Sequence, residues 1–197
     1  LTERNIPLRL TEIKQALNLP VSSLHNMLQT MVSAEVVTVD DDLRYAVGPR
    51  TVSLALRTVQ SLDLRTVARR PLQDLARELG DDVYLALRVG QRIIYVDRVL
   101  GSQRISLDIR LGEPLMMHCT AIGKLFAALD GRLEAHVLAG KLPKMTAFTI
   151  TDAKQLKKEF ARIREAGFSR SEQEAMAGVV GYALPISDGT GSTVAAV

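Results

Sequence analysis

Few side chains in this sequence have the types and spacing that catalysis or metal binding would need. His118 and Cys119 are adjacent, but neighbours on an extended segment point to opposite faces, and no third group is evident that could orient them as base and nucleophile. The other histidines, His25 and His136, are remote in the sequence, and Cys119 is the single cysteine. We therefore expect no catalytic residue, no metal site, no internal disulfide and no cofactor. An enzyme that uses His118 or Cys119 remains one alternative.

Another set of polar side chains has the spacing needed to read DNA. They lie on one face of a helix expected after Pro20, and they are Ser22, Ser23, His25, Asn26 and Gln29. When a helix enters the major groove, side chains of these types on its first turns can form hydrogen bonds with base edges. This stretch is the part of the sequence that points to a function.

Two short helical patterns joined by a tight turn would position these side chains. The first covers residues 10–17 and is stopped by Asn18, Leu19 and Pro20, because proline lacks a backbone donor and pushes its predecessor out of the helical region. Either Ser22 or Ser23 is expected to cap the second. Its inward positions should be Leu24, Met27, Leu28 and Met31. The spacing is that of a helix-turn-helix, although any helical hairpin with polar outer faces would show it too.

A pair of short strands follows and predicts the wing of a winged helix. The strands cover residues 36–39 and 44–47, and the turn between them holds three aspartates. Arg44 on the returning strand and Arg50 beyond it could contact phosphate, whereas the aspartates would repel it. The chain carries a net charge of +3, but residues 1–60 hold six basic and six acidic side chains. We therefore expect modest DNA affinity for each monomer.

Three motifs, in order along the chain, resemble the IclR family of bacterial transcriptional regulators. The first is Gly48-Pro49-Arg50 at the start of a helical pattern, and the second runs from Gly112 to Lys124 and is similar to the family's G..LP.H.TA.GK signature. The third comprises Ala166, Gly167 and Phe168 followed by Glu172, Glu174, Gly178, Val179, Ala183 and Pro185. The resemblance implies a ligand-responsive, sequence-specific DNA-binding transcriptional regulator. Its partners would be a double-stranded DNA operator, a small-molecule effector and further copies of itself, as a homodimer or a tetramer.

The resemblance also implies a division of the chain into domains. Residues 1–48 would form a winged helix-turn-helix DNA-binding domain with a truncated first helix, residues 49–63 a linker helix, and residues 64–197 an effector-binding domain with a truncated C-terminus. No apolar run approaches the roughly 20 residues that span a bilayer, and no secretory leader opens the chain. We therefore expect a cytoplasmic protein without a membrane partner.

The second half of the sequence alternates strand and helix patterns. After a helix over residues 64–79 that Pro71 interrupts, strands are expected at 83–89, 93–99, 105–111, 179–186 and 193–197, and helices at 121–129 and 156–163. This order favours an α+β fold. By resemblance it would be a GAF-like antiparallel sheet flanked by helices.

An effector pocket is implied by the resemblance, between the sheet and the loops of the second and third motifs. The candidate residues by position are Leu107, Leu115, Ala121, Ile122, Ser171, Val179 and Gly181. Family members that bind small keto acids have an aspartate at the position of Ser171 and a cysteine at that of Gly181. Because both polar groups are missing here, we expect a bulkier or more apolar effector, such as an aromatic acid. A structural alternative is that Ser171 and Glu174 form a capping box.

Two positions of the second helix depart from the family pattern. Val21 replaces a residue that is commonly basic, and Asn26 replaces an arginine. Asparagine can pair with adenine through two hydrogen bonds, so we expect an altered sequence preference and a lower affinity.

The helix expected at 156–163 and the residues next to it carry a basic face. The face holds Lys154, Lys157, Lys158, Arg162 and Arg164, and is expected to be solvated unless it forms a second DNA surface. The remaining alternative is a small-molecule binding module whose helix-turn-helix makes protein contacts.

Overall fold

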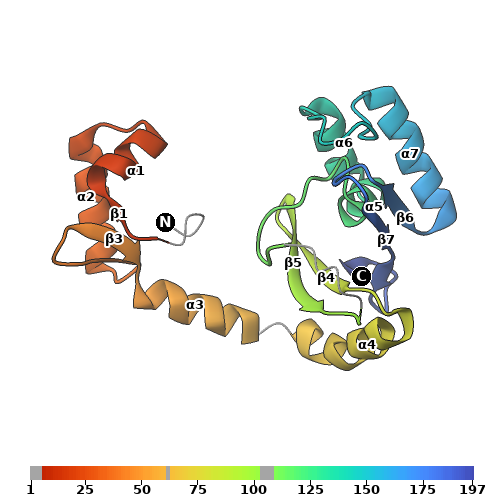
Figure 1. Cartoon of the computed structure of the whole chain (residues 1–197), viewed down its shortest axis with the longest axis horizontal. Coiled ribbons are helices and arrows are strands. Elements are labelled where there is room, and N and C mark those ends of the chain that lie inside the picture. The colour runs from red at the N-terminus through yellow and green to blue at the C-terminus, as the bar shows by residue number, and fades with distance from the viewer. Residues whose placement is uncertain (1–5, 61–62, 103–108) are drawn as a thin grey trace. The chain divides into compact units, whose positions relative to one another are not determined.

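The fold of the chain is known from a computed structural model that describes residues 6–60, 63–102 and 109–197. The chain divides into two compact units, Leu1–Asp63 and Leu64–Val197 (Figure 1). Among the described residues, no helix is both long and apolar enough to cross a membrane.

The first unit is a winged helix-turn-helix, as expected. Its elements are β1 (Leu8–Arg9), α1 (Leu10–Leu17), α2 (Val21–Ser33), β2 (Val37–Val39), β3 (Arg44–Val47) and α3 (Pro49–Gln60). The strands form an antiparallel sheet in the order β1-β3-β2, in which Val39 pairs with Tyr45. The small core contains Leu8, Ile13, Leu24, Leu28, Val37 and Tyr45. Helices and wing therefore share one apolar centre.

Details of the second helix differ from the sequence prediction. It begins at Val21, one residue after Pro20, so Ser22 and Ser23 lie inside its first turn and neither is the cap. The helix can start this early because the Pro20 carbonyl already accepts the Leu24 amide at 3.0 Å. Met27, expected to face inward, is 42% exposed, because only the stripe of Leu24 and Leu28 is buried against the small core.

The second unit contains two antiparallel sheets and four helices among the described residues 64–102 and 109–197. The elements are α4 (Asp63–Leu79), β4 (Val83–Val89), β5 (Arg92–Val99), α5 (Ala121–Leu129), α6 (Gly131–Ala139), α7 (Ala153–Ala166), β6 (Ser169–Glu172), β7 (Val180–Ala183), β8 (Pro185–Ser187) and β9 (Thr193–Ala196). The larger sheet has the order β5-β4-β9-β8, and the smaller one pairs β6 with β7. The predicted α+β class is confirmed.

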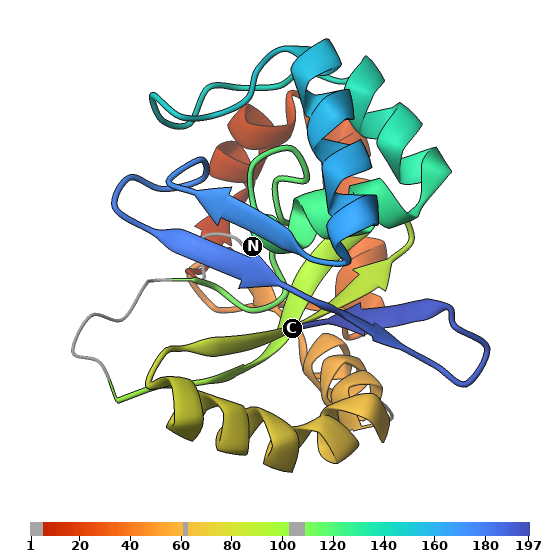
Figure 2. The same ribbon diagram turned by 90° about the vertical axis from the view of Figure 1, so that its right-hand side faces the viewer.

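Helices cover the two faces of the larger sheet, α4 on one side and α5 to α7 on the other (Figure 2). Neighbouring residues of β9 alternate accordingly: Ala195 packs with Leu72 and Ala76 of α4, and Ala196 packs with the cluster that contains α5. The sheet therefore separates two apolar cores.

Several expected elements are corrected by the structure. Helix α4 continues through Pro71. Of the strand expected at 105–111, residues 105–108 lie outside the described part, and residues 109–111 are not in a strand. The strand expected at 179–186 is two strands of different sheets, separated at Leu184. Neither β6 nor α6 was expected.

Candidate DNA-binding and effector-binding sites

Helix α2 exposes the polar side chains that the sequence singles out for DNA recognition. Ser22, Ser23, His25, Asn26 and Gln29 are all exposed. Within residues 6–60, none of these five side chains has a hydrogen-bond partner; the backbone carbonyls of Asn26 and Gln29 accept from Thr30 and Ser33. Leu24 and Leu28 anchor the opposite face and are 0% and 3% exposed. The polar edge is thus held on a fixed helix with its hydrogen-bonding groups free.

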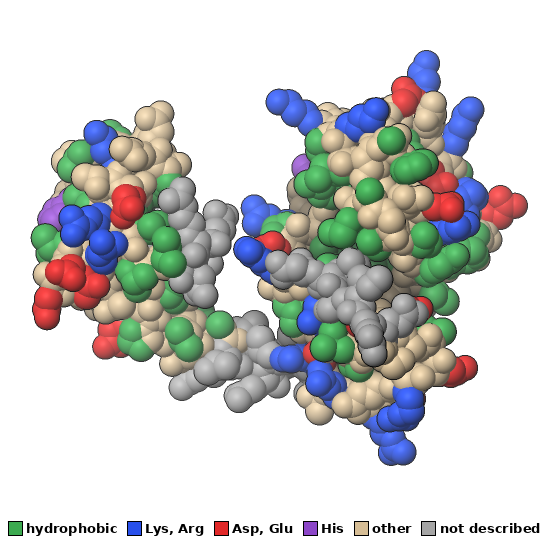
Figure 3. Space-filling model, viewed as in Figure 1, with side chains coloured by type: hydrophobic (Ala, Val, Ile, Leu, Met, Phe, Trp, Pro, Cys, Tyr) green, Lys and Arg blue, Asp and Glu red, His purple; other side chains and the backbone are tan. Residues whose placement is uncertain are grey.

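The wing places Arg44 beside a turn that is organised by an aspartate. Asp40 Oδ1 accepts the amides of Asp42 at 3.1 Å and Arg44 at 2.8 Å, so this carboxylate shapes the turn. Arg44 is half-buried and Arg50 is exposed, and neither guanidinium forms an ion pair with a described residue. Figure 3 shows basic and acidic side chains next to one another on this unit, so its surface is not uniformly positive.

The junction between wing and α3 depends on close backbone contact. A Cβ atom added to Gly48 would lie 2.2 Å from the Glu35 carbonyl oxygen. The Gly48 amide donates to the Val36 carbonyl at 2.9 Å, and the Arg50 amide donates to the Glu35 carbonyl at 3.1 Å. A glycine is therefore required here. Its close contact with Glu35 holds the start of α3, and with it Arg50, next to the end of the wing.

In the second unit, three of the predicted effector residues lie close together. Ser171 of β6 is opposite Gly181 of β7. A Cβ atom added to Gly181 would lie 3.6 Å from the Ala121 Cβ atom at the start of α5. The Ser171 hydroxyl donates to the Cys119 carbonyl at 2.6 Å, just before α5. The second and third motifs therefore meet at the N-terminus of this helix, although Ser171 lies in a strand and does not form the capping box that its spacing allowed.

The sequence TAIGK builds this helix N-terminus. The Thr120 hydroxyl caps α5 by accepting the Gly123 amide at 3.1 Å. Gly123 has no room for a side chain, because an added Cβ atom would lie 2.6 Å from Met117 Cα. The amides of Ala121 and Ile122 in the first turn have no partner inside the helix, which is the arrangement that favours an anion.

The other predicted effector residues are more scattered. Ile122 is buried, and Leu115 packs partly buried against the same core. Val179 is half-buried in the segment before β7, and Leu107 lies outside the described residues. Their role as an effector site stays a prediction.

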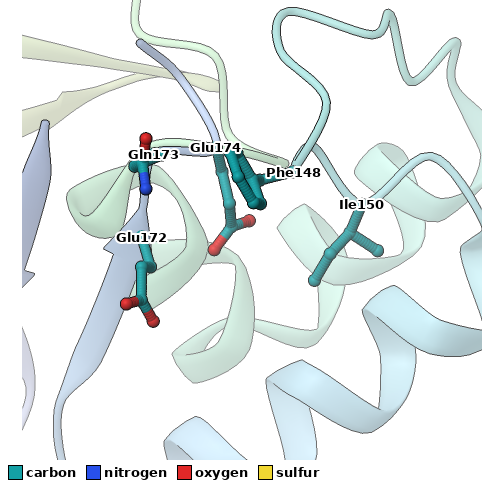
Figure 4. A pocket seen from close by; sticks show the side chains of 5 residues that line it. All are labelled: Phe148, Ile150, Glu172, Gln173 and Glu174. Atoms are coloured by element: carbon teal, nitrogen blue, oxygen red, sulfur yellow. The ribbon is translucent and has the colours of Figure 1, made fainter. Parts of the chain in front are cut away.

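Two surface hollows in the described part of the second unit are lined by residues that neighbour this region in the sequence. One, of about 390 Å³, is lined by Phe148, Ile150, Glu172, Gln173 and Glu174. Figure 4 shows Glu174 beside Phe148, with Glu172 on one side and Ile150 on the other. The other hollow, of about 300 Å³, is lined by residues 116–118 and by residues of α6 and the loop after it. None of the predicted effector residues lines either hollow.

A buried ion cluster lies under the first hollow, and no pattern in the sequence indicates it as a unit. The Lys124 side chain is fully buried, with Nζ 2.5 Å from Glu174 Oε1 and 3.2 Å from Glu159 Oε1. Burial raises the pKa of Glu174, and the Lys124 ammonium only partly opposes this. For Glu159, the hydrogen bonds from Arg162 and Lys124 outweigh burial and lower the pKa. Lys124 and Glu174 belong to two different motifs, fifty positions apart in the sequence.

The geometry around His118 and Cys119 does not produce a nucleophile. Both side chains are buried, and His118 Nε2 lies 2.9 Å from the Pro143 carbonyl oxygen. Burial raises the pKa of the Cys119 thiol to about 11, with a smaller contribution from Glu174, whereas a nucleophilic cysteine needs a lowered one.

The basic face of α7 is partly neutralised. Arg162 pairs with Glu159, and Arg164 pairs with Glu134 at 2.7 Å and donates to the Ala128 carbonyl. Lys154, Lys157 and Lys158 are exposed. The two arginines therefore have structural partners.

Two family models match the chain. The model described as "Bacterial transcriptional regulator IclR C-terminal" matches residues 56–197, and the one described as "IclR helix-turn-helix domain" matches residues 1–41. Among curated proteins, the HTH-type transcriptional regulator XynR of Escherichia coli is 27% identical over 99% of this chain and 79% of its own length. The HTH-type transcriptional regulator Rv1719 of Mycobacterium tuberculosis is 35% identical over 68% of this chain and 52% of its own length.

A solved structure of similar fold holds a ligand. It is an IclR homologue from Microbacterium hydrocarbonoxydans complexed with 4-hydroxybenzoate. It is 25% identical, has a TM-score of 0.79, and the match covers 96% of this chain and 79% of that one.

Proposed function

This chain belongs to the IclR family of bacterial transcriptional regulators, and from this premise we propose which of its residues bind DNA and the effector. It is a DNA-binding regulator with a C-terminal ligand-binding domain. We assign residues 1–48 to the DNA-binding domain, 49–63 to a linker helix and 64–197 to the effector-binding domain. Gene control, not catalysis, is the role of its named relatives.

The proposed base-reading residues are the exposed polar side chains of α2: Ser22, Ser23, His25, Asn26 and Gln29. The observation that carries this assignment is that their hydrogen-bonding groups lack partners within residues 6–60, while Leu24 and Leu28 hold the helix from behind. Arg44 and Arg50 would contact phosphate and so set affinity without reading sequence. As a two-fold dimer, the protein would bind half-sites one helical turn of DNA apart, or a multiple of it.

Alanine variants test the DNA assignment. Operator sites selected from random duplexes by the wild-type chain would serve as probes for Asn26→Ala and Gln29→Ala. Each variant should lose about 5- to 150-fold in affinity for the selected site, the cost of one good base contact, and keep its non-specific binding. Thr30→Ala is the matched control, because Thr30 is also exposed on α2 but its hydroxyl bonds within the helix. Equal binding by all three variants and the wild type would refute the assignment.

For the effector site, we propose that a carboxylate binds at the first turn of α5. The partial positive charge and the unpaired amides of Ala121 and Ile122 favour an anion there. Ser171 and Gly181 lie beside this turn. Leu115 and Val179, which belong to the same two motifs, would add apolar surface to the site. Because Gly181 has no side chain and the Ser171 hydroxyl already donates to a carbonyl, the lining has few free polar groups. This composition supports an aromatic acid, the class to which the 4-hydroxybenzoate bound by the Microbacterium relative belongs.

Calorimetry distinguishes this proposal from a keto-acid site. Titration of the chain with 4-hydroxybenzoate and with pyruvate should give tighter binding of the aromatic acid. Gly181→Leu, which fills the space beside Ala121, should weaken that binding, whereas Gly189→Ala in the exposed β8–β9 turn should not. Tighter binding of pyruvate would contradict the proposed pocket.

A further inference from the structure

Lys124 and Glu174 belong to the two motifs that meet at the effector site, yet the proposed function gives them no role. The Lys124 ammonium is fully buried and contacts carboxylates from two other segments, Glu174 after β6 and Glu159 on α7. A buried ion pair is a poor source of net stability, because desolvation offsets the attraction, but in some proteins such groups specify one arrangement of the segments that they join.

Both residues of the pair lie close in the sequence to the proposed effector contacts, Lys124 on α5 and Glu174 after β6. Lys124 follows Ala121 by three positions on α5, and Glu174 follows Ser171 by three positions. The Glu174 backbone is itself held, because its carbonyl accepts the Thr149 hydroxyl at 2.7 Å. The Thr146 hydroxyl donates to the Gln173 carbonyl, also at 2.7 Å. The carboxylate is therefore presented to Lys124 from a fixed loop.

The charges around the pair leave it little freedom. From α7, Glu159 shares the Lys124 ammonium and is itself paired with Arg162. The Cys119 thiol faces the pair from the segment before α5, and its raised pKa keeps it neutral. The second Glu174 oxygen, Oε2, is buried without a hydrogen-bond partner among the described residues. Loss of the Lys124 contact would therefore leave the buried Glu174 side chain without an ionic partner and remove the attraction between this loop and α5.

We propose that Lys124 and Glu174 are positioning residues of the effector site: their ion pair holds the first turn of α5 against Ser171 and Gly181, although neither side chain touches the effector. The proposal rests on the effector site proposed above.

A cysteine pair measures this positioning without any ligand. The Cβ atoms of Ala121→Cys and Gly181→Cys would lie 3.6 Å apart, within the range of a disulfide. In a Cys119→Ala background, the equilibrium of this disulfide with glutathione gives the effective concentration of the two thiols. Lys124→Met and, separately, Glu174→Gln should each lower it by about tenfold, the coupling expected between residues of one network. Glu174→Gln is nearly isosteric and keeps the test valid if Lys124→Met does not fold.

The matched control is Asp97→Asn, which breaks another ion pair of the same unit, in which the carboxylate of Asp97 is buried and its partner Arg69 of α4 is partly exposed. Asp97→Asn should lower the stability of the unit and leave the effective concentration of the two thiols unchanged. The comparison therefore separates loss of the positioning contact from a general loss of stability. The proposal is overturned if the Lys124 and Glu174 variants behave like Asp97→Asn, or if the Ala121→Cys, Gly181→Cys pair forms no disulfide in the chain that keeps Lys124 and Glu174. If 4-hydroxybenzoate and pyruvate both fail to bind the wild-type chain while the cross-link responds as expected, the effector assignment fails and the positioning contact stands.

Discussion

Gly48→Ala should unfold the winged helix locally, and the structure gives the size of the effect. The added methyl group would lie 2.2 Å from the Glu35 carbonyl oxygen, more than 1 Å short of the 3.4 Å at which ordinary contact begins. Overpacking of this kind costs about 1–3 kcal/mol, and a backbone shift would also weaken the Gly48–Val36 and Arg50–Glu35 hydrogen bonds, at about 0.5–1.5 kcal/mol each. We expect a total of about 3 kcal/mol.

Amide hydrogen exchange read by mass spectrometry measures this loss in one unit at a time. In peptides that cover β3, protection should fall by roughly 100-fold, the equivalent of that free energy, while peptides that cover α5 keep theirs. Gly131→Ala is the control, because an added Cβ atom there meets nothing within 4 Å at the start of α6. Unchanged protection of β3 in Gly48→Ala would refute the argument that this junction requires a glycine.

Three further predictions concern the second unit. Burial alone would raise the pKa of Asp97, but hydrogen bonds from Arg69, the Arg98 amide and Arg65 lower it below the unfolded value of about 3.9. The ionised carboxylate therefore stabilises the fold at pH values above about 3.9. This stabilisation disappears as the pH falls through the lower pKa of the native state. Asp97→Asn should therefore cost about 2 kcal/mol in urea unfolding at pH 7 and progressively less below pH 4; a cost independent of pH would be inconsistent with an ionic role. The Cys119 thiol, with its pKa of about 11, should react with Ellman's reagent at pH 8 only after unfolding, and fast reaction of the native protein would contradict its burial. Replacement of Lys154, Lys157 and Lys158 by glutamine should leave the salt dependence of DNA binding unchanged if this face is solvated, whereas a smaller slope would make it a second DNA surface.

Elements with strong apolar periodicity could be predicted from the sequence. Strand β4 has the predicted bounds, Val83–Val89, and α5 has the predicted bounds, Ala121–Leu129, because both are bounded by clear turn or cap residues. Helix α6 was missed, although the Asp130 cap and the spacing of Leu133 and Val137 could have indicated it. Strand β6 was missed because its buried residues, Ser169 and Ser171, are small and polar and give no apolar alternation.

The sites could be predicted only as far as local patterns reach. The exposed edge of α2 follows from helical spacing within a few residues. The meeting of Ser171, Gly181 and Ala121 needed the family resemblance, because strand pairing brings together positions far apart in the sequence. The Lys124–Glu174 pair could not be found from sequence: a lysine in a helix is normally expected at the surface, and only the folded chain supplies the carboxylate that makes its burial possible.

We propose above that the polar edge of α2 reads the bases of an operator. Selection of binding sites from random DNA by the wild-type chain and by Asn26→Arg tests it most directly. The selected sequence should change at one base of each half-site, from adenine to guanine, because asparagine pairs with adenine and arginine with guanine. An identical selected sequence for both proteins would contradict it.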